Sequence, residues 1–357
     1  MADHHHSGVP GSPSDSADRI ANLLDLGRPA DALDECGRAL TLYPDNSELL
    51  ALASMCTRRL GRFAEAVSLA ERAVAAQPGD DYAHGMLASA QLAAGRPDLA
   101  AQTAYTAVQM RPSHWFHHAR YAECLIALPG GRDQALQAAQ RAVELAPDEP
   151  RAHGTLASVA YPTGAKPTFE HLNLAEAALH EALRLSPGNA AMLHDLARVR
   201  LARADHAGAL SGFSDAIVMD PRRTGETALS NVRYALKRIV LFQSLMVIAA
   251  TVLGSWIGGK NPSTVSRGAI VVLALALGVL LVVRWRAFLA GASARMVVGQ
   301  VFRGARPLVG ALVFVVLALG ALLLAAFLPG GGPTGALGAA FMLAFGAVSC
   351  VMLARSR

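Results

Sequence analysis

Residues 61–78 read GRFAEAVSLAERAVAAQP, and residues 95–112 read GRPDLAAQTAYTAVQMRP. Both begin with glycine, carry alanine at the sixth and thirteenth positions, and end with proline. Residues 27–44, GRPADALDECGRALTLYP, show the same pattern, so the signature returns every 34 residues. A period of this length is typical of a helical-hairpin repeat, in which each unit buries its apolar face by stacking on its neighbours.

The signature residues predict what each unit looks like. Ala66 and Ala73 are two helical turns apart, so they lie on one face of a helix and let a neighbouring helix approach closely. Gly61 falls where one helix stops and the chain reverses, and Pro78 ends the second helix. Each unit is therefore expected to be a helix, a turn, a second helix and a stop.

This pattern resembles the tetratricopeptide repeat (TPR) family, whose units carry small residues at these second-helix positions and a proline at the exit. The unit over residues 47–80 matches best, with Phe63 at the family's aromatic position. Three further units follow with slips in the period, and their marker residues are Ala135, Ala142 and Pro147; Ala175, Ala182 and Pro187; and Ala209, Ala216 and Pro221. About six repeats of an all-α solenoid are thus expected between residues 13 and 221.

Three departures from the pattern carry information. The 40-residue interval before Ala175 predicts an insertion within residues 161–170, because insertions in solenoids map to loops. Arg19 stands in the first unit where the family prefers an apolar residue. Ala204 and Asp205 replace the turn glycine of the sixth unit, and terminal units that depart in this way behave like caps.

Charge and hydropathy divide the chain into two parts. All 27 carboxylates lie before residue 227, and residues 1–238 carry 23 Lys and Arg, a formal balance of −4. The other basic residues lie in a strongly apolar segment, residues 239–357. Because the repeat region is mildly acidic and has no basic face, the pI of about 9.3 does not indicate a nucleic-acid partner, and none is expected.

Four stretches in the second part contain no ionisable side chain: residues 239–257, 268–283, 307–328 and 335–354. At about 1.5 Å per residue they are long enough to cross a bilayer, the second with help from its flanking arginines. We therefore predict a four-helix transmembrane domain over residues 239–357. A buried soluble bundle is the alternative, and the absence of a polar stripe disfavours it.

These elements give the expected domain order. A disordered tail (residues 1–15) precedes the solenoid (16–221), which is followed by a capping or juxtamembrane helix (222–238) and the membrane domain. Small residues in the last stretch also allow close helix contact, including contact between copies of the chain in a homo-oligomer.

Basic residues predict the orientation in the membrane, because cytoplasmic loops hold more of them than translocated loops do. The loop between the second and third stretches carries Arg284, Arg286, Arg295, Arg303 and Arg306, whereas the opposite loops carry only Lys260 and Arg267. We thus expect a multi-pass protein of the cell membrane, with both termini and the repeats in the cytoplasm. Apolar residues between those arginines also predict an amphipathic helix lying on the lipid surface.

The inner face of such a solenoid is lined by the first helix of each unit, which makes a groove suited to a peptide or a partner helix. The family resemblance implies these groove positions: Glu48, Met55, Arg58, Arg59, Tyr82, Ser89, Phe116, Glu123, His194 and Arg198. Alternatively, individual members of this set are ordinary solvated or helix-packing residues. The asparagine and lysine set with which some family members hold chaperone tails is absent.

No arrangement of residues predicts catalysis, a cofactor or a metal. His114, His117 and His118 have helical spacing that could bind a metal, but such residues more often satisfy hydrogen bonds at a helix start. Residues 254–261 follow the spacing of a phosphate-binding loop only until Asn261, where that motif needs a hydroxyl. The four cysteines show no paired spacing, which is typical of small packing residues in a reducing compartment.

The functional prediction is a membrane-anchored TPR scaffold or adaptor that mediates protein–protein interaction at the cytoplasmic face, without catalysis. Its partners would be a protein or peptide and the lipid bilayer. The alternative is a regulatory or assembly subunit of a membrane transport or envelope enzyme complex, in which the spans act and the repeats regulate. The spans hold few polar residues and no charge, whereas proton and ion pathways usually need charge inside the membrane.

Overall fold

The computed structural model describes residues 12–162 and 168–258, and parts of the segment that follows: 272, 274, 276–280, 283, 286, 291–304, 306–325, 336, 339–340 and 342–348. Every regular element in these ranges is a helix. The chain divides into two compact units, Met1–Leu185 and Ser186–Arg357, each of which is described by itself.

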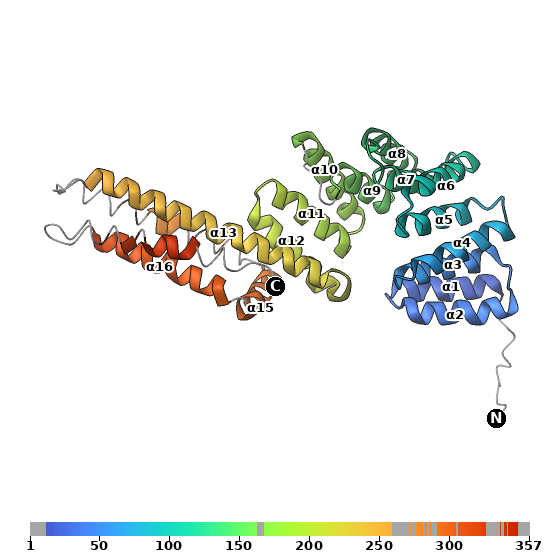
Figure 1. Cartoon of the computed structure of the whole chain (residues 1–357), viewed down its shortest axis with the longest axis horizontal. Helices are drawn as coiled ribbons and strands as arrows, with labels where there is room; N and C mark the ends of the chain where they lie inside the picture. Colours follow the sequence, from blue (N-terminus) through green and yellow to red (C-terminus); the bar gives the residue numbers. More distant parts are fainter. Residues whose placement is uncertain are drawn as a thin grey trace, which may run out of the picture. The chain divides into compact units, whose positions relative to one another are not determined.

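The first unit is a row of five helical hairpins (Figure 1). Their helices are α1 (Pro13–Asp25) with α2 (Pro29–Leu42), α3 (Ser47–Arg59) with α4 (Phe63–Ala76), α5 (Asp81–Ala93) with α6 (Pro97–Met110), α7 (Trp115–Leu125) with α8 (Arg132–Leu145), and α9 (Pro150–Ala160) with α10 (Phe169–Leu185). The predicted all-α hairpin solenoid is confirmed in this unit.

The turn inside a hairpin requires a left-handed backbone conformation. Gly27, Gly61 and Gly95 have φ of 68°, 77° and 75°, values that glycine adopts without the clash a Cβ causes. The same position of the sixth hairpin holds Ala204, with φ of 62°. The predicted turn glycines are therefore confirmed, and the predicted departure at residue 204 is a strained alanine.

The signature alanines form the seam between neighbouring helices. Ala66 and Ala73 of α4 and Ala100 and Ala107 of α6 are fully buried. The second helices α2, α4, α6 and α8 each contact the first helix of their own hairpin and that of the next, while the first helices contact one another in the series α1, α3, α5, α7 and α9. Because the first helices pack directly on each other, they form the inner row of the solenoid.

The insertion in the fifth hairpin is shared between a loop and a helix. Helix α9 ends at Ala160 and α10 begins at Phe169, with residues 163–167 outside the described part. Helix α10 has 17 residues, whereas α4 and α6 have 14. The extra residues thus fall where they were predicted, and some of them lengthen the start of α10.

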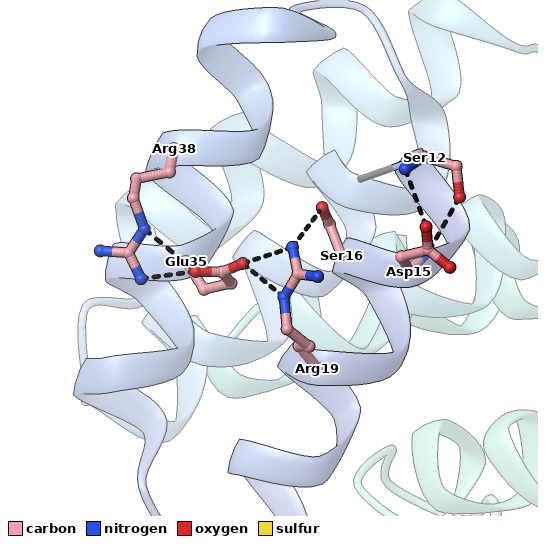
Figure 2. Close-up of polar contacts among 6 residues, drawn as sticks. All are labelled: Ser12, Asp15, Ser16, Arg19, Glu35 and Arg38. Carbon is pink, nitrogen blue, oxygen red and sulfur yellow. Dashed lines mark hydrogen bonds and ion pairs between the residues drawn. The ribbon is translucent and has the colours of Figure 1, made fainter. Parts of the chain in front are cut away.

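The first hairpin shows how an arginine replaces an apolar residue (Figure 2). Arg19 on α1 and Arg38 on α2 both donate to the Glu35 carboxylate, over 2.9 and 3.0 Å from their Nε atoms. The hydrogen bonds from Arg38 and then Arg19 lower the pKa of Glu35. Helix α1 begins earlier than residue 16, because Ser12 and Asp15 cap it reciprocally.

The second unit begins with the sixth hairpin, α11 (Ala190–Ala202) and α12 (His206–Met219), followed by α13 (Pro221–Gly258), α15 (Ala292–Gly304) and α16 (Arg306–Ala325). Helix α13 is continuous over 38 residues and includes both the expected capping helix and the first apolar stretch. Ala228, Val232 and Ala235, which the sequence places on one side of the capping helix, are all fully buried.

The segment expected to lie on the lipid surface contains a helix, α15, that packs on protein. Its Val297, Val298 and Val301 are buried in a cluster with Phe213 of α12 and Val232 of α13. The Ser293 hydroxyl also donates to the Asp215 carboxylate of α12. The apolar face of α15 is therefore covered by the last repeat rather than by lipid.

One helix in the described part is long and apolar enough to cross a bilayer, Thr227–Leu253, with a mean hydropathy of 1.8. Val309–Ala321, within the third expected stretch, is a shorter apolar helix. Half of the residues in the second and fourth stretches, 268–283 and 335–354, lie outside the described part of the chain. The expected four-helix transmembrane domain is therefore not supported by this test, which finds one such helix among the described residues.

Candidate peptide-binding groove

The inner row of the first unit brings equivalent positions of successive hairpins together. Glu48 on α3, Tyr82 on α5, Phe116 on α7 and Arg151 on α9 are each the second residue of their helix. Successive members are 34, 34 and 35 residues apart, which is the repeat period with its one-residue slip. Side chains that are distant in sequence therefore line one strip of the inner face.

Two aromatic rings of this strip lie beside each other and beside two guanidinium groups. The rings of Tyr82 and Phe116 stack with centroids 6.2 Å apart. The Cζ atoms of Arg120 and Arg151 lie 5.1 and 5.9 Å from the Phe116 centroid, within the range of cation–π attraction. We call these four residues together with Arg58 and Glu123 the groove cluster.

The groove cluster holds more positive than negative charge. Arg120 forms an ion pair with Glu123, three residues along α7. Burial lowers the pKa of Arg58, and the charges of Arg120 and Arg59 lower it further. Among the described residues, no hydrogen bond or ion pair engages the guanidinium group of Arg58. Burial, and then the charge of Glu48, raise the pKa of Tyr82, so its hydroxyl is neutral near pH 7.

A polar network beside this strip joins hairpins 3 and 4. The Oδ2 atom of Asp81 lies 2.5 Å from Nε2 of the buried His117, and its Oδ1 atom lies 2.9 Å from Arg111. His118 instead contacts the Pro112 carbonyl oxygen through Nε2, over 2.8 Å. The two histidines thus have different structural partners, and the described residues contain no group of three potential metal ligands.

The predicted groove residues do not all contribute to one surface. Glu48, Arg58, Tyr82, Phe116 and Glu123 lie on the inner row of the first unit, close to the groove cluster or within it.

Several of the others are engaged elsewhere. Met55 packs partly buried against the core, and the buried Ser89 donates to the Gly85 carbonyl oxygen. The Arg59 Nη1 atom donates to the Leu24 carbonyl oxygen of the first hairpin over 2.6 Å.

His194 and Arg198 belong to the second unit and pack within it. The His194 ring lies 5.3 Å from that of Phe213, and its Nε2 atom is 3.2 Å from the Asn231 amide of α13. Arg198 pairs with Asp195 on the same helix. His194 therefore lies where α13 covers the last hairpin, and Arg198 lies one helical turn further along α11.

Two members of the groove cluster were missed in the sequence. Arg151 occupies the same repeat position as Tyr82 and Phe116, but the 35-residue slip hides it from a strict 34-residue frame. Arg120 lies one helical turn from both Phe116 and Glu123, which identifies a shared helix face. The spacing of these residues in the sequence was therefore sufficient to identify both arginines.

Comparison with known families agrees with this architecture. Residues 23–90 match the family model described as tetratricopeptide repeat. The chain therefore contains a TPR region, as the resemblance implied. No curated protein matches the chain.

Several solved structures are similar in part. A thermophilic TPR protein from Thermus thermophilus is 23% identical, with 53% of this chain and 100% of that chain covered and a TM-score of 0.47. MamA from Desulfovibrio magneticus is 20% identical, with 50% and 97% covered and a TM-score of 0.38. Yeast Tom70 is 19% identical, with 62% and 46% covered and a TM-score of 0.47. These values assign no function to the chain.

Proposed function

We propose that the chain is a membrane-anchored scaffold whose TPR groove binds a protein or peptide partner, without catalysis of its own. The observation that carries this proposal is the groove cluster on the inner row, where Tyr82, Phe116 and Arg58 present partly buried surface. Aromatic and arginine side chains are enriched among the residues that supply most binding energy in protein interfaces. TPR-type solenoids provide extended surfaces of this kind.

The distribution of side-chain size in the second unit supports membrane anchoring. Its core contains many small residues, among them Ala250 of α13 and Ala311 and Ala318 of α16, with Ala340, Ala344 and Ala347. Large apolar side chains are exposed instead, among them Phe242, Leu245 and Val252 on α13, and Val313, Val316 and Leu317 on α16. Apolar helices that pack through small residues and expose large ones suit a lipid surround.

We extend the proposal to the four-span topology predicted from the sequence, with the repeats and both termini at the cytoplasmic face. Arginines in the loop between the second and third spans support this orientation. A reporter that is active only outside the cytoplasm, fused after Arg357, is expected to stay inactive. The same reporter placed between residues 258 and 267 is expected to be active, and the reverse pattern would contradict the orientation.

Site-specific photo-cross-linking tests the scaffold role. A photoreactive amino acid in place of Tyr82 in the full chain is expected to cross-link a partner in living cells. The control carries it in place of Leu99 on α6, which is exposed but lies on a second helix. Cross-linking at residue 99 with none at residue 82 would contradict the groove, and substrate turnover by the purified chain would contradict the non-enzymatic role.

A further inference from the structure

The groove cluster has an excess of guanidinium groups around one aromatic centre. Arg58 projects from α3, Arg120 from α7 and Arg151 from α9, and the last two approach the same Phe116 ring. Glu123 is the carboxylate that pairs with Arg120. The cluster of six residues therefore carries three positive charges and one negative charge, in a repeat region whose overall balance is negative.

Partial burial strengthens the preference of these arginines for an anion. The Arg120 side chain is 15% exposed, and its Nε atom has no hydrogen-bond acceptor among the described residues. Arg58 is half-buried and faces the like charges of Arg59 and Arg120. An added carboxylate would relieve this repulsion and accept paired hydrogen bonds from a planar guanidinium, an arrangement that favours arginine over lysine.

The neighbouring groups restrict what kind of anion fits. Glu48 belongs to the strip and Glu123 to the groove cluster, so a polyanion such as a phosphate backbone would meet repulsion beside the arginines. The stacked rings of Tyr82 and Phe116 offer apolar surface next to the guanidinium groups. A single carboxylate beside an apolar or aromatic side chain therefore matches both the charge and the surface.

We propose that the groove cluster binds an acidic residue, Asp or Glu, that is flanked by an aromatic or large apolar residue in a peptide segment of a protein partner. Arg58, Arg120 and Arg151 bind the carboxylate, and the rings of Tyr82 and Phe116 contact the flanking side chain. This inference rests on the proposed scaffold function and adds the chemistry of the partner.

The test uses the full chain in uncharged nanodiscs and a bead library of random octapeptides. The selected peptides are expected to share Asp or Glu beside an aromatic residue. Replacing that acid by its amide in the best peptide is expected to weaken binding by about tenfold or more, because the neutral amide loses the charge-assisted hydrogen bonds that the carboxylate accepts from the arginines. In the double variant Arg58→Gln/Arg120→Gln, the acid and amide peptides are expected to bind equally.

Arg96→Gln is the matched control, since Arg96 is exposed at the start of α6, away from the inner row. It should keep the full difference between acid and amide peptides. Helical circular dichroism of each variant separates a binding defect from misfolding, and Arg151→Gln provides a second variant if the double variant fails to fold.

The other outcomes separate the two proposals. Selected peptides with no acidic preference, or an amide peptide that binds as well as the acid, would overturn this inference and leave the scaffold function standing. Failure to select any peptide would contradict both. Displacement of the best peptide by inositol hexakisphosphate at lower concentration than by the free acidic peptide would overturn the inference in favour of a phosphate site.

Discussion

Single residues in the hairpin turns set the backbone direction of the solenoid. Gly61 has φ of 77°, and a Cβ built on it would meet nothing within 4 Å. Glycine is therefore required at position 61 by the backbone conformation, and not by a lack of room for a side chain. Ala204 adopts the same region without the freedom of glycine, so the sixth hairpin contains strain that the second and third avoid.

Exchanging these residues should change stability in opposite directions. Gly61→Ala is expected to lower the free energy of unfolding by about 1 kcal/mol, because an alanine in this region costs roughly that amount, and Ala204→Gly should raise it by up to about 1 kcal/mol. Urea unfolding followed by circular dichroism measures both. The control is Gly79→Ala, at a turn position with ordinary φ and open space; a loss there equal to that of Gly61→Ala would refute the explanation.

His117 makes the junction of hairpins 3 and 4 sensitive to pH. Burial lowers its pKa below the usual value of 6.5, against the opposing effect of its hydrogen bond to Asp81. At pH values around 6.5 and below, this group in the unfolded chain therefore binds a proton more readily than in the folded chain. By linkage, this group's contribution to stability is fully present above about pH 6.5 and is lost as the pH falls below that value.

His117→Gln keeps a hydrogen-bond donor towards Asp81 but does not titrate. The variant is expected to lose less stability than the parent chain between pH 7.5 and pH 5.5, as measured by urea unfolding at each pH. Identical pH dependence in the two proteins would rule out His117 as a source of this sensitivity.

At the level of elements, the sequence pattern of α15 is sufficient to predict a helix but not to predict what covers its apolar face. Its valines correctly predict an amphipathic helix, but their spacing is the same whether lipid or protein covers them. The covering groups, such as Phe213, come from elements about 80 residues away in the chain. Turn glycines, seam alanines and exit prolines were predictable because each acts through local backbone conformation or close helix approach.

The groove cluster shows the same limit at a smaller scale. The repeat frame located Tyr82 and Phe116, since equivalent positions of a regular array share a face. It could not reveal that Arg59 turns to the Leu24 carbonyl, or that Ser89 is buried. Those outcomes depend on side-chain rotamers and on packing between hairpins, which a period does not encode.

The docking of α15 on the last repeat can be tested by truncating a valine. Val301→Ala removes buried methyl groups from a side chain that is 2% exposed, at an expected cost of about 2 kcal/mol. Amide hydrogen exchange in α15 should then be roughly thirtyfold faster in the purified full chain. Met296→Ala is the control, because Met296 is 58% exposed, and equal acceleration by both changes would contradict the contact.

For the whole molecule, the second unit buries many small residues and exposes large apolar side chains. This is the reverse of what is expected of a domain surrounded by water. Soluble proteins rarely expose contiguous apolar patches of more than a few hundred Å², yet α13 and α16 both present rows of large apolar side chains. The first unit, by contrast, carries several ion pairs on exposed helix faces, as in Arg141 with Glu144 and Arg184 with Glu181. The two units suit different surroundings.

Val316→Arg distinguishes lipid from water around α16. Val316 is 66% exposed near the middle of the helix, where an arginine facing lipid costs about 2.5–3.5 kcal/mol. The variant is expected to leave less folded protein in the membrane fraction of cell-free synthesis with vesicles, whereas Val316→Leu should behave like the parent chain. If water surrounds this face, the arginine will change the free energy of unfolding by no more than about 0.5 kcal/mol, and that result would refute membrane insertion.

Because α13 is one continuous helix, the rotation of its first part about the helix axis fixes the rotation of its second part. Ala228, Val232 and Ile239 pack with the last hairpin and α15, and Val240 and Val247 continue the same buried stripe into the small-residue core. Successive residues turn by about 100°, so inserting or deleting one residue between these groups would rotate one stripe out of phase with the other. Variation in chain length is therefore restricted along this stretch, although loops elsewhere tolerate it.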